Sequence, residues 1–332
     1  MPHLLLTGAG FSRNWGGFLA IEAFEFLLGC PELNALIRNR LWANSGNFEE
    51  TYQQLRDAAA DPADLVAADN FARFNKMLIR MFDTMKLGFR STHIERAQDR
   101  GVFAIDALLD HFDAIFTLNQ DTLLEQHYIY NIPQTPPPHK WEARYIPGLM
   151  PPEPTTVHGN QLSKATVRSI MESGFVLEAG KQPYFKLHGS YNWRARDQHV
   201  MVIGGAKVDD INRIALLSWY QERFHEMICG SNTRLMIIGY SFNDDHINAQ
   251  LAAAARAGAK MFIVDMQGLD VIDKRDVRMR AAIPPAPLFN TLRDNIVGAS
   301  RRLLRPTLQS DPVEVKKYVD FLGIEIRYRY DE

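Results

Sequence analysis

Three polar side chains, each placed just after a short apolar run, could act on one ligand: Asn119, Asp121 and His188. An imidazole with a pKa near ~6.5 is suited to general base work at neutral pH, and an amide beside a carboxylate can hold the polar groups of a ligand. Two plainer interpretations stay open. Asp121 can cap a helix expected over residues 122–128, and a single histidine is commonly a hydrogen-bonded structural residue. Capping would leave Asn119 unexplained.

A glycine-rich segment follows the first apolar run of the chain. Five of its residues are expected to contact a dinucleotide: Gly8, Ala9, Gly10, Phe11 and Ser12. Glycines at a strand-to-helix junction let backbone N–H groups approach a pyrophosphate at the start of the next helix, which we expect over residues 18–28. The third glycine of the dehydrogenase fingerprint would fall at Arg13, so hydride transfer is disfavoured. A tight turn without a ligand is the alternative.

The last two apolar runs also end in residues that could bind a nucleotide. Gly239 permits close approach of a ligand, and Ser241 can donate a hydrogen bond to a phosphate. Asp265 is placed where an acidic side chain could bind ribose hydroxyls.

The apolar runs have the length and composition of buried parallel strands. They cover residues 4–6, 114–118, 184–187, 235–238 and 261–264. Ligands of open α/β sheets bind at the carboxyl ends of the strands, so we expect the polar residues at one edge of one sheet. The predicted fold class is α/β, with a Rossmann-like parallel sheet.

Two long segments separate the expected strands within what we treat as a single domain, residues 1–332. Residues from about 31 to 108 have helical spacing and almost no glycine, which predicts an inserted helical module. Residues 133–154 carry eight of the 17 prolines and predict an extended loop. Such a loop is either a lid over the site or a surface excursion, and the sequence leaves both open.

Composition excludes several classes of protein. The formal net charge of −2 gives no general attraction to nucleic acid, so no direct nucleic-acid binding is expected. Two cysteines are too few for a disulfide scaffold or a four-cysteine zinc site, and we expect a reduced, cytoplasmic protein without a metal site. No segment offers the ~20 apolar residues of a membrane span, and the short first run does not fit a signal peptide.

Taken in order, the motifs resemble the sirtuin-type NAD-binding fold. Four segments match the family's motifs: Gly-Ala-Gly-Phe-Ser at 8–12, Asn-Gln-Asp at 119–121, His-Gly-Ser at 188–190 and Gly-Tyr-Ser at 239–241. The resemblance implies that NAD is bound, with its phosphates and adenosine held by the glycine and serine segments. It implies His188 as general base, Asn119 holding a ribose hydroxyl or the water, and Asp121 binding the nicotinamide carboxamide.

The chain also departs from sirtuin deacylases. It lacks their four-cysteine zinc ribbon and the Gly-Ile-Pro-Asp-Phe-Arg continuation of their first loop. In Lys-Leu-His-Gly-Ser-Tyr-Asn-Trp at 186–193 and Ile-Gly-Tyr-Ser-Phe-Asn-Asp at 238–244, it is more similar to the sirtuin-like NADase domain of bacterial antiphage defence systems. This resemblance implies hydrolysis of NAD, as substrate, to nicotinamide and ADP-ribose.

Two other functions remain open at this point. An NAD-dependent protein deacylase or ADP-ribosyltransferase would need a peptide groove, which the missing zinc ribbon disfavours. A non-catalytic sensor of NAD or ADP-ribose would use the glycine segment but would not need His188 and Asn119. The resemblance further implies a homo-oligomer, or a separate partner such as a HerA-type ATPase or an Argonaute-like protein, because no second domain is visible in the sequence.

Overall fold

A seven-stranded parallel sheet forms the centre of the molecule. The computed structural model describes residues 1–92, 94, 104–129, 140–150, 167–196, 198–275, 278, 280 and 282–324. The strand order is β10-β9-β8-β1-β2-β5-β3, and every adjacent pair is parallel. The strands are β1 (His3–Thr7), β2 (Ala114–Thr117), β3 (Ala143–Tyr145), β5 (Lys181–Lys186), β8 (Arg234–Ile238), β9 (Lys260–Val264) and β10 (Ile296–Ser300).

The predicted α/β class is confirmed, and the five apolar runs correspond to β1, β2, β5, β8 and β9. Their residues are almost all buried on both faces of the sheet, which is why they read as continuous apolar runs. The sequence did not reveal β3 and β10. Both are edge strands with mostly half-buried residues, so they carry no continuous apolar signal.

The strand order creates a switch point between β1 and β8. The chain passes from β1 to β2 on one side, and from β8 to β9 on the other. The connections that leave β1 and β8 therefore diverge, and they open a crevice at the carboxyl ends of the strands. Crevices of this kind are the usual ligand sites of open α/β sheets.

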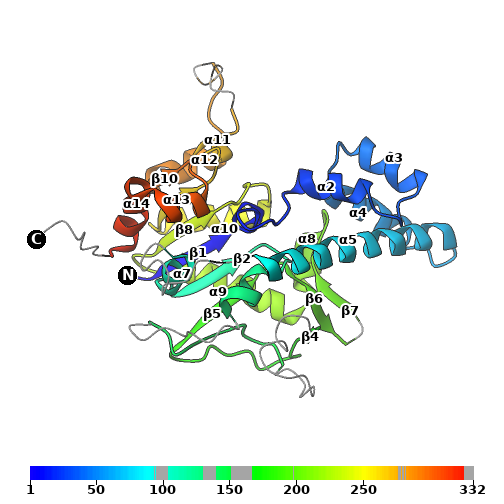
Figure 1. Cartoon of the computed structure of the whole chain (residues 1–332), viewed down its shortest axis with the longest axis horizontal. Helices are drawn as coiled ribbons and strands as arrows, with labels where there is room; N and C mark the ends of the chain where they lie inside the picture. The colour runs from blue at the N-terminus through cyan, green and yellow to red at the C-terminus, as the bar shows by residue number, and fades with distance from the viewer. Residues whose placement is uncertain are drawn as a thin grey trace, which may run out of the picture.

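Helices cover the sheet and build a module beside it (Figure 1). They are α1 (Ala9–Arg13), α2 (Ala20–Leu28), α3 (Ala35–Ala43), α4 (Phe48–Ala58), α5 (Leu65–Ser91), α7 (Ile105–Asp110), the π-helix η2 (Glu125–Ile129), α8 (Lys207–Asn212), α9 (Ala215–Ile228), α10 (Asp245–Arg256), α11 (Asp270–Asp273), α12 (Pro287–Leu292), the 3₁₀-helix η5 (Arg293–Asn295), α13 (Leu304–Ser310) and α14 (Pro312–Leu322). The helix expected over 18–28 begins at Ala20, and a separate short helix, α1, starts directly after Gly8.

The segment from about 31 to 108 holds α3, α4 and α5, which pack on one another and on α2. Their starts are set by side-chain caps: Asn34 accepts from the N–H of Ile37, Asn47 from that of Glu50, and Asp64 from that of Ala67. Figure 1 shows α2, α3, α4 and the outer end of α5 gathered to one side of the sheet. We call α2 to α5 the helical module.

A smaller sheet, with strand order β4-β6-β7, lies next to the crevice. Its strands are β4 (Arg168–Ser169), β6 (Gly189–Ala195) and β7 (Gln198–Met201). β6 begins directly after His188. Gly189 has φ +69 and packs against the backbone of Val200, so the chain can turn there at once from β5 into β6.

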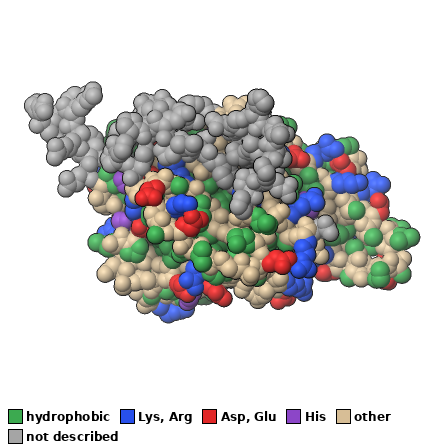
Figure 2. Space-filling model, turned by 90° about the horizontal axis from the view of Figure 1, so that it is seen from below, with side chains coloured by type: hydrophobic (Ala, Val, Ile, Leu, Met, Phe, Trp, Pro, Cys, Tyr) green, Lys and Arg blue, Asp and Glu red, His purple; other side chains and the backbone are tan. Residues whose placement is uncertain are grey.

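Of the expected loop at 133–154, only residues 140–150 lie within the described part of the chain, and they include β3. No helix among the described residues is long and apolar enough to cross a membrane. On the face seen in Figure 2, basic and acidic side chains lie interspersed.

Candidate functional site

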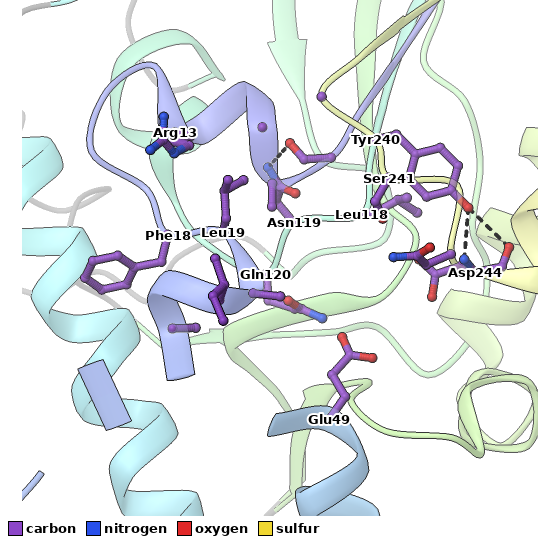
Figure 3. A pocket seen from close by; sticks show the side chains of 18 of the residues that line it. Arg13, Phe18, Leu19, Glu49, Leu118, Asn119, Gln120, Tyr240, Ser241 and Asp244 are labelled. Atoms are coloured by element: carbon purple, nitrogen blue, oxygen red, sulfur yellow. Dashed lines mark hydrogen bonds between the residues drawn. The ribbon is translucent and has the colours of Figure 1, made fainter. Parts of the chain in front are cut away.

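A cavity of about 1030 Å³ opens at the carboxyl ends of β1, β2, β5, β8 and β9. Nine of the residues singled out from the sequence line it: Gly8, Ala9, Gly10, Asn119, Asp121, His188, Gly239, Ser241 and Asp265. The helical module and the residues that lead into α2 contribute a wall that includes Phe18, Leu19 and Glu49 (Figure 3). The parallel sheet thus brings together residues that are far apart in the sequence.

Phe11 and Ser12 lie behind the cavity wall and are not part of its lining. Phe11 is 1% exposed and packs against Trp15, with ring centroids 5.3 Å apart. Ser12 is buried, and its Oγ accepts a hydrogen bond of 2.9 Å from Nδ2 of Asn119. Ser12 therefore supports the cavity wall through Asn119.

Asn119 is held in one orientation by the glycine-rich segment. Its Nδ2 also donates to the carbonyl of Gly8 at 2.9 Å, and its backbone N–H donates to Oγ1 of Thr117 at 3.1 Å. Because Nδ2 is used twice, Oδ1 is the atom that the amide can offer to a ligand as an acceptor.

Asp121 combines a local structural role with a position at the cavity. Its Oδ1 accepts from the backbone N–H of Leu123 at 2.9 Å, which is the capping interaction considered above. Its carbonyl accepts from Nζ of Lys186, which also pairs with Oε1 of Glu125 at 2.6 Å. This ion pair is almost fully enclosed, with side-chain exposures of 0% and 4%, and it fixes the turn that carries Asn119 and Asp121.

The glycines at the switch point pack backbone against backbone. A Cβ on Gly8 would lie 2.5 Å from the carbonyl oxygen of Gly239, and one on Gly10 would lie 2.7 Å from the Cα of Gly239. The N–H of Gly8 donates to Ile238, and that of Gly10 to Gly239, both at 3.0 Å. These two N–H groups are therefore engaged by the β8 turn. The structural reason for glycine here is the close approach of two turns, and the expectation of free N–H groups facing a pyrophosphate does not hold at these two positions.

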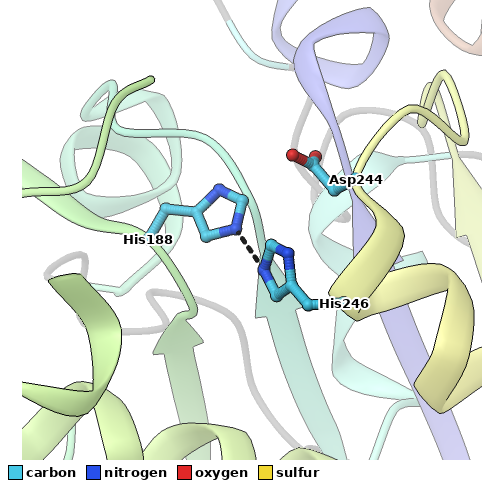
Figure 4. Close-up of side chains that lie close together, drawn as sticks. All are labelled: His188, Asp244 and His246. Carbon is cyan, nitrogen blue, oxygen red and sulfur yellow. Dashed lines mark hydrogen bonds between the residues drawn. The ribbon is translucent and has the colours of Figure 1, made fainter. Parts of the chain in front are cut away.

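His188 forms a pair with a histidine that the sequence analysis did not single out. The Nε2 atoms of His188 and His246 are 3.0 Å apart (Figure 4). His188 is 2% exposed, and burial lowers its pKa to about 3. Burial also lowers the pKa of His246, so both rings are neutral at pH 7. His246 follows the Gly-Tyr-Ser motif at the same edge of the sheet, and that position is the signal from which it could have been found.

Asp244 lies beside the histidine pair and joins it to the helical module. It occupies the position before α10, yet its side chain does not cap that helix. Its Oδ1 pairs with Nζ of Lys207 at 2.5 Å, and the same Nζ pairs with Oε2 of Glu49 at 2.8 Å. Glu49 belongs to α4, so an ion-pair chain runs from the helical module to the cavity.

His188, Asp244 and His246 are also the residues of the described chain that could hold a metal, since their ligand atoms lie within 4.8 Å of one another. In the structure the two Nε2 atoms lie at hydrogen-bonding distance, 3.0 Å, and the ring centroids are 5.1 Å apart. Both cysteines, Cys30 and Cys229, are free thiols.

Ser241 and Asp265 lie at the β8 and β9 ends of the cavity. Ser241 is exposed to it. Asp265 accepts from the N–H of Gln267 at 2.8 Å, and burial raises the pKa of its carboxyl group. Both residues line the cavity.

A family model for the SIR2-like domain matches residues 113–280. This match covers half of the chain. The chain belongs to the SIR2-like family. Membership implies binding of NAD in general, and SIR2-like proteins are NAD-dependent enzymes. No curated protein matches the sequence.

The SIR2-like segment carries half of the residues that line the cavity. It begins immediately before β2 and includes Asn119, Asp121, His188, Gly239 and Asp265. The glycine-rich segment at 8–12 lies outside the matched residues. In the structure, β1 nevertheless pairs with both β2 and β8, so this segment forms part of the same SIR2-like site.

Proposed function

We propose that the protein hydrolyses NAD at the bond between nicotinamide and ribose. Water adds to C1′ of the ribose while the C1′–N bond breaks. The electron pair of that bond neutralises the nicotinamide ring, and a proton leaves the water. The products are nicotinamide and ADP-ribose. An oxocarbenium-like state of this kind is assisted by a base and by fixed polar groups next to the reacting carbon.

One observation carries this proposal: an amide with a fixed orientation and a pair of neutral imidazoles face the same cavity at the switch point. Asn119 offers Oδ1, and His188 lies with His246 at the end of the neighbouring strand. The volume of about 1030 Å³ is at the upper end of the roughly 300–1,000 Å³ typical of ligand pockets, as a dinucleotide requires.

The remaining roles follow from the lining of the cavity. Asn119 holds a ribose hydroxyl or the water. Asp121 binds the nicotinamide carboxamide through Oδ2, because Oδ1 is used by Leu123. Ser241 hydrogen-bonds a phosphate, and Asp265 bonds the adenosine ribose.

Release of nicotinamide from NAD by the purified protein, without any other substrate, tests the proposal. We expect release by the wild type and a loss of about 10²–10⁴-fold in His188→Ala. Release only after an acylated peptide is added would favour a deacylase. Binding of NAD without turnover, unchanged in His188→Ala, would favour a sensor.

We further propose that this activity depletes NAD in antiphage defence and that assembly of the protein controls it. The motifs at 186–193 and 238–244 support this context. The assembly is a homo-oligomer or a complex with a separate ATPase or Argonaute-like partner. Nicotinamide release measured with and without the product of a neighbouring gene tests the second arrangement.

A further inference from the structure

The lining of the cavity holds more acidic than basic side chains. Among the described residues that line it, six carry a carboxylate: Glu49, Glu50, Asp121, Asp244, Asp245 and Asp265. Three carry a cation: Arg13, Lys207 and Arg302. A dinucleotide brings further negative charge on its phosphates, and the N–H groups of Gly8 and Gly10 do not offset it because they donate to the turn after β8. Binding of a phosphate here therefore calls for one of the three cations.

Two of these cations are already neutralised by carboxylates. Nε and Nη2 of Arg13 lie 2.9 and 2.7 Å from Oε1 of Glu22. Nζ of Lys207 lies 2.8 Å from Glu49 and 2.5 Å from Asp244. A phosphate would have to compete with these carboxylates for either side chain.

Arg302 is the cation whose charge remains available. Its carboxylate neighbour within the described part of the chain is Asp311, whose Oδ2 lies 3.9 Å from Nε of Arg302, beyond hydrogen-bonding distance. The side chain of Arg302 is 69% exposed and yet lines the cavity, so it lies at the rim. A ligand phosphate can therefore reach this guanidinium without displacing a hydrogen-bonded carboxylate.

The backbone on both sides of Arg302 is fixed, so the side chain is placed at the rim before a ligand arrives. The carbonyl of Ser300, at the end of β10, accepts from the N–H of Asp265 at 3.1 Å. Oγ of Ser300 accepts from the N–H of Arg302 at 3.1 Å. Further along the chain, the N–H of Arg305 donates to Oδ1 of Asn14 at 3.1 Å. Arg302 thus lies on a segment that runs from the side of Asp265 back to the end of α1.

We propose that Arg302 binds a phosphate group of the dinucleotide at the rim of the cavity. This inference rests on the proposed function for the identity of the ligand. A guanidinium group can donate two parallel N–H···O bonds to phosphate oxygens. The segment between Asp265, to which the adenosine ribose is assigned, and α1 offers two sources of that group. One is the diphosphate that joins the two nucleosides, and the other is a 2′-phosphate on the adenosine ribose, as in NADP.

Calorimetry with two ligands that lack the nicotinamide bond, and so stay intact, tests the contact. ADP-ribose carries the diphosphate, and ADP-ribose 2′-phosphate carries both groups. In Arg302→Gln we expect affinity to fall about 10- to 100-fold. A loss for both ligands assigns Arg302 to the diphosphate, and a loss for the second ligand alone assigns it to the 2′-phosphate. Wild-type affinity for both ligands would overturn the inference.

Arg301→Gln is the matched control. It removes the neighbouring arginine, which is also exposed, does not line the cavity and pairs with Asp270 at 2.8 Å. We expect it to bind both ligands as the wild type does. An equal loss of affinity in Arg301→Gln would show a general effect of charge and would overturn the contact.

Arg302→Lys keeps the charge without the planar fork, so it should bind better than Arg302→Gln and less tightly than the wild type. A lysine variant that binds no better than the glutamine variant would also overturn the inference. A wild type that binds ADP-ribose through Arg302 but releases no nicotinamide from NAD in any assembly would refute the proposed function and leave the phosphate contact intact.

Discussion

Asn119 and Ser12 are joined by a hydrogen bond of 2.9 Å from Nδ2 to Oγ. The bond ties the turn after β2 to the first turn after β1. With the second bond to Gly8, it fixes the Asn119 amide before any ligand arrives. Preorganised polar groups of this kind accelerate reactions because they need not reorient in the transition state.

Asn119→Ala should reduce turnover by about 10²–10³-fold while NAD still binds, because the proposed role of the amide is orientation in the transition state. Ser12→Ala removes only one of the two hydrogen bonds that hold that amide, so it should reduce turnover by roughly tenfold or less. Nicotinamide release gives the rate at saturation, and calorimetry gives the affinity. Lost affinity with a normal rate at saturation would contradict the role given to Asn119.

Gly10→Val should lower stability and abolish NAD binding as a consequence. Its Cβ would lie 2.7 Å from the Cα of Gly239, so the turns after β1 and β8 would have to separate. Gly88→Ala, in the last turn of α5 with nothing within 4 Å of the added atom, is the control and should melt at the same temperature or higher. A Gly10→Val protein with wild-type stability and affinity would show that the contact between the turns is dispensable.

The sequence predicted five strands of the central sheet and polar residues at their carboxyl ends, because both depend on local patterns. Strands such as β1 and β8 are buried on both faces, and the carboxyl ends of parallel strands meet at one edge. The pairing of His188 with His246 joins residues 58 positions apart, and no local spacing encodes it. The ion-pair chain through Lys207 likewise depends on where the helical module packs.

Acid should destabilise the fold through His188. Its pKa is about 3 in the folded protein and near 6.5 when unfolded. Between these values the unfolded state binds a proton that the folded state does not, so stability is full above about pH 6.5 and falls as the pH drops toward 3. One proton accounts for at most about 1.4 kcal/mol per pH unit. Urea unfolding at pH 7 and pH 5 should therefore show that the free energy of unfolding falls less in His188→Gln than in the wild type. Equal losses in both proteins would contradict the prediction.

The buried pair of Lys186 and Glu125 should be costly to break. Lys186→Met leaves the Glu125 carboxylate enclosed without its cation, which typically costs about 3–5 kcal/mol. The double variant Lys186→Met with Glu125→Leu should recover much of that loss, because no charge stays buried. Urea unfolding of the single and double variants measures both effects. A single variant as stable as the wild type would mean that Glu125 is already neutral in the folded protein, which is the direction in which burial shifts its pKa.

Assembly should raise turnover per subunit. The helical module exposes several large apolar side chains that could form a repeated contact surface: Ile21, Trp42, Leu65 and Val66. Its α4 reaches the cavity through Glu49 and Lys207, the latter bonded to Asp244 at 2.5 Å. A contact that shifts α4 would therefore act through this ion-pair chain on Asp244, which lies beside the histidine pair.

We expect a dilute monomer to be weakly active and an oligomer to be strongly active, because an uncontrolled NADase would deplete the NAD of its own cell. Turnover per subunit should be measured across a dilution series, with light scattering giving the size at each concentration. Trp42→Asp should reduce both assembly and activity. Glu49→Gln should assemble normally. Its turnover per subunit should rise less on assembly, because the ion-pair chain has lost the charge of Glu49. A verified monomer that turns over NAD as fast as any assembly would exclude this form of control.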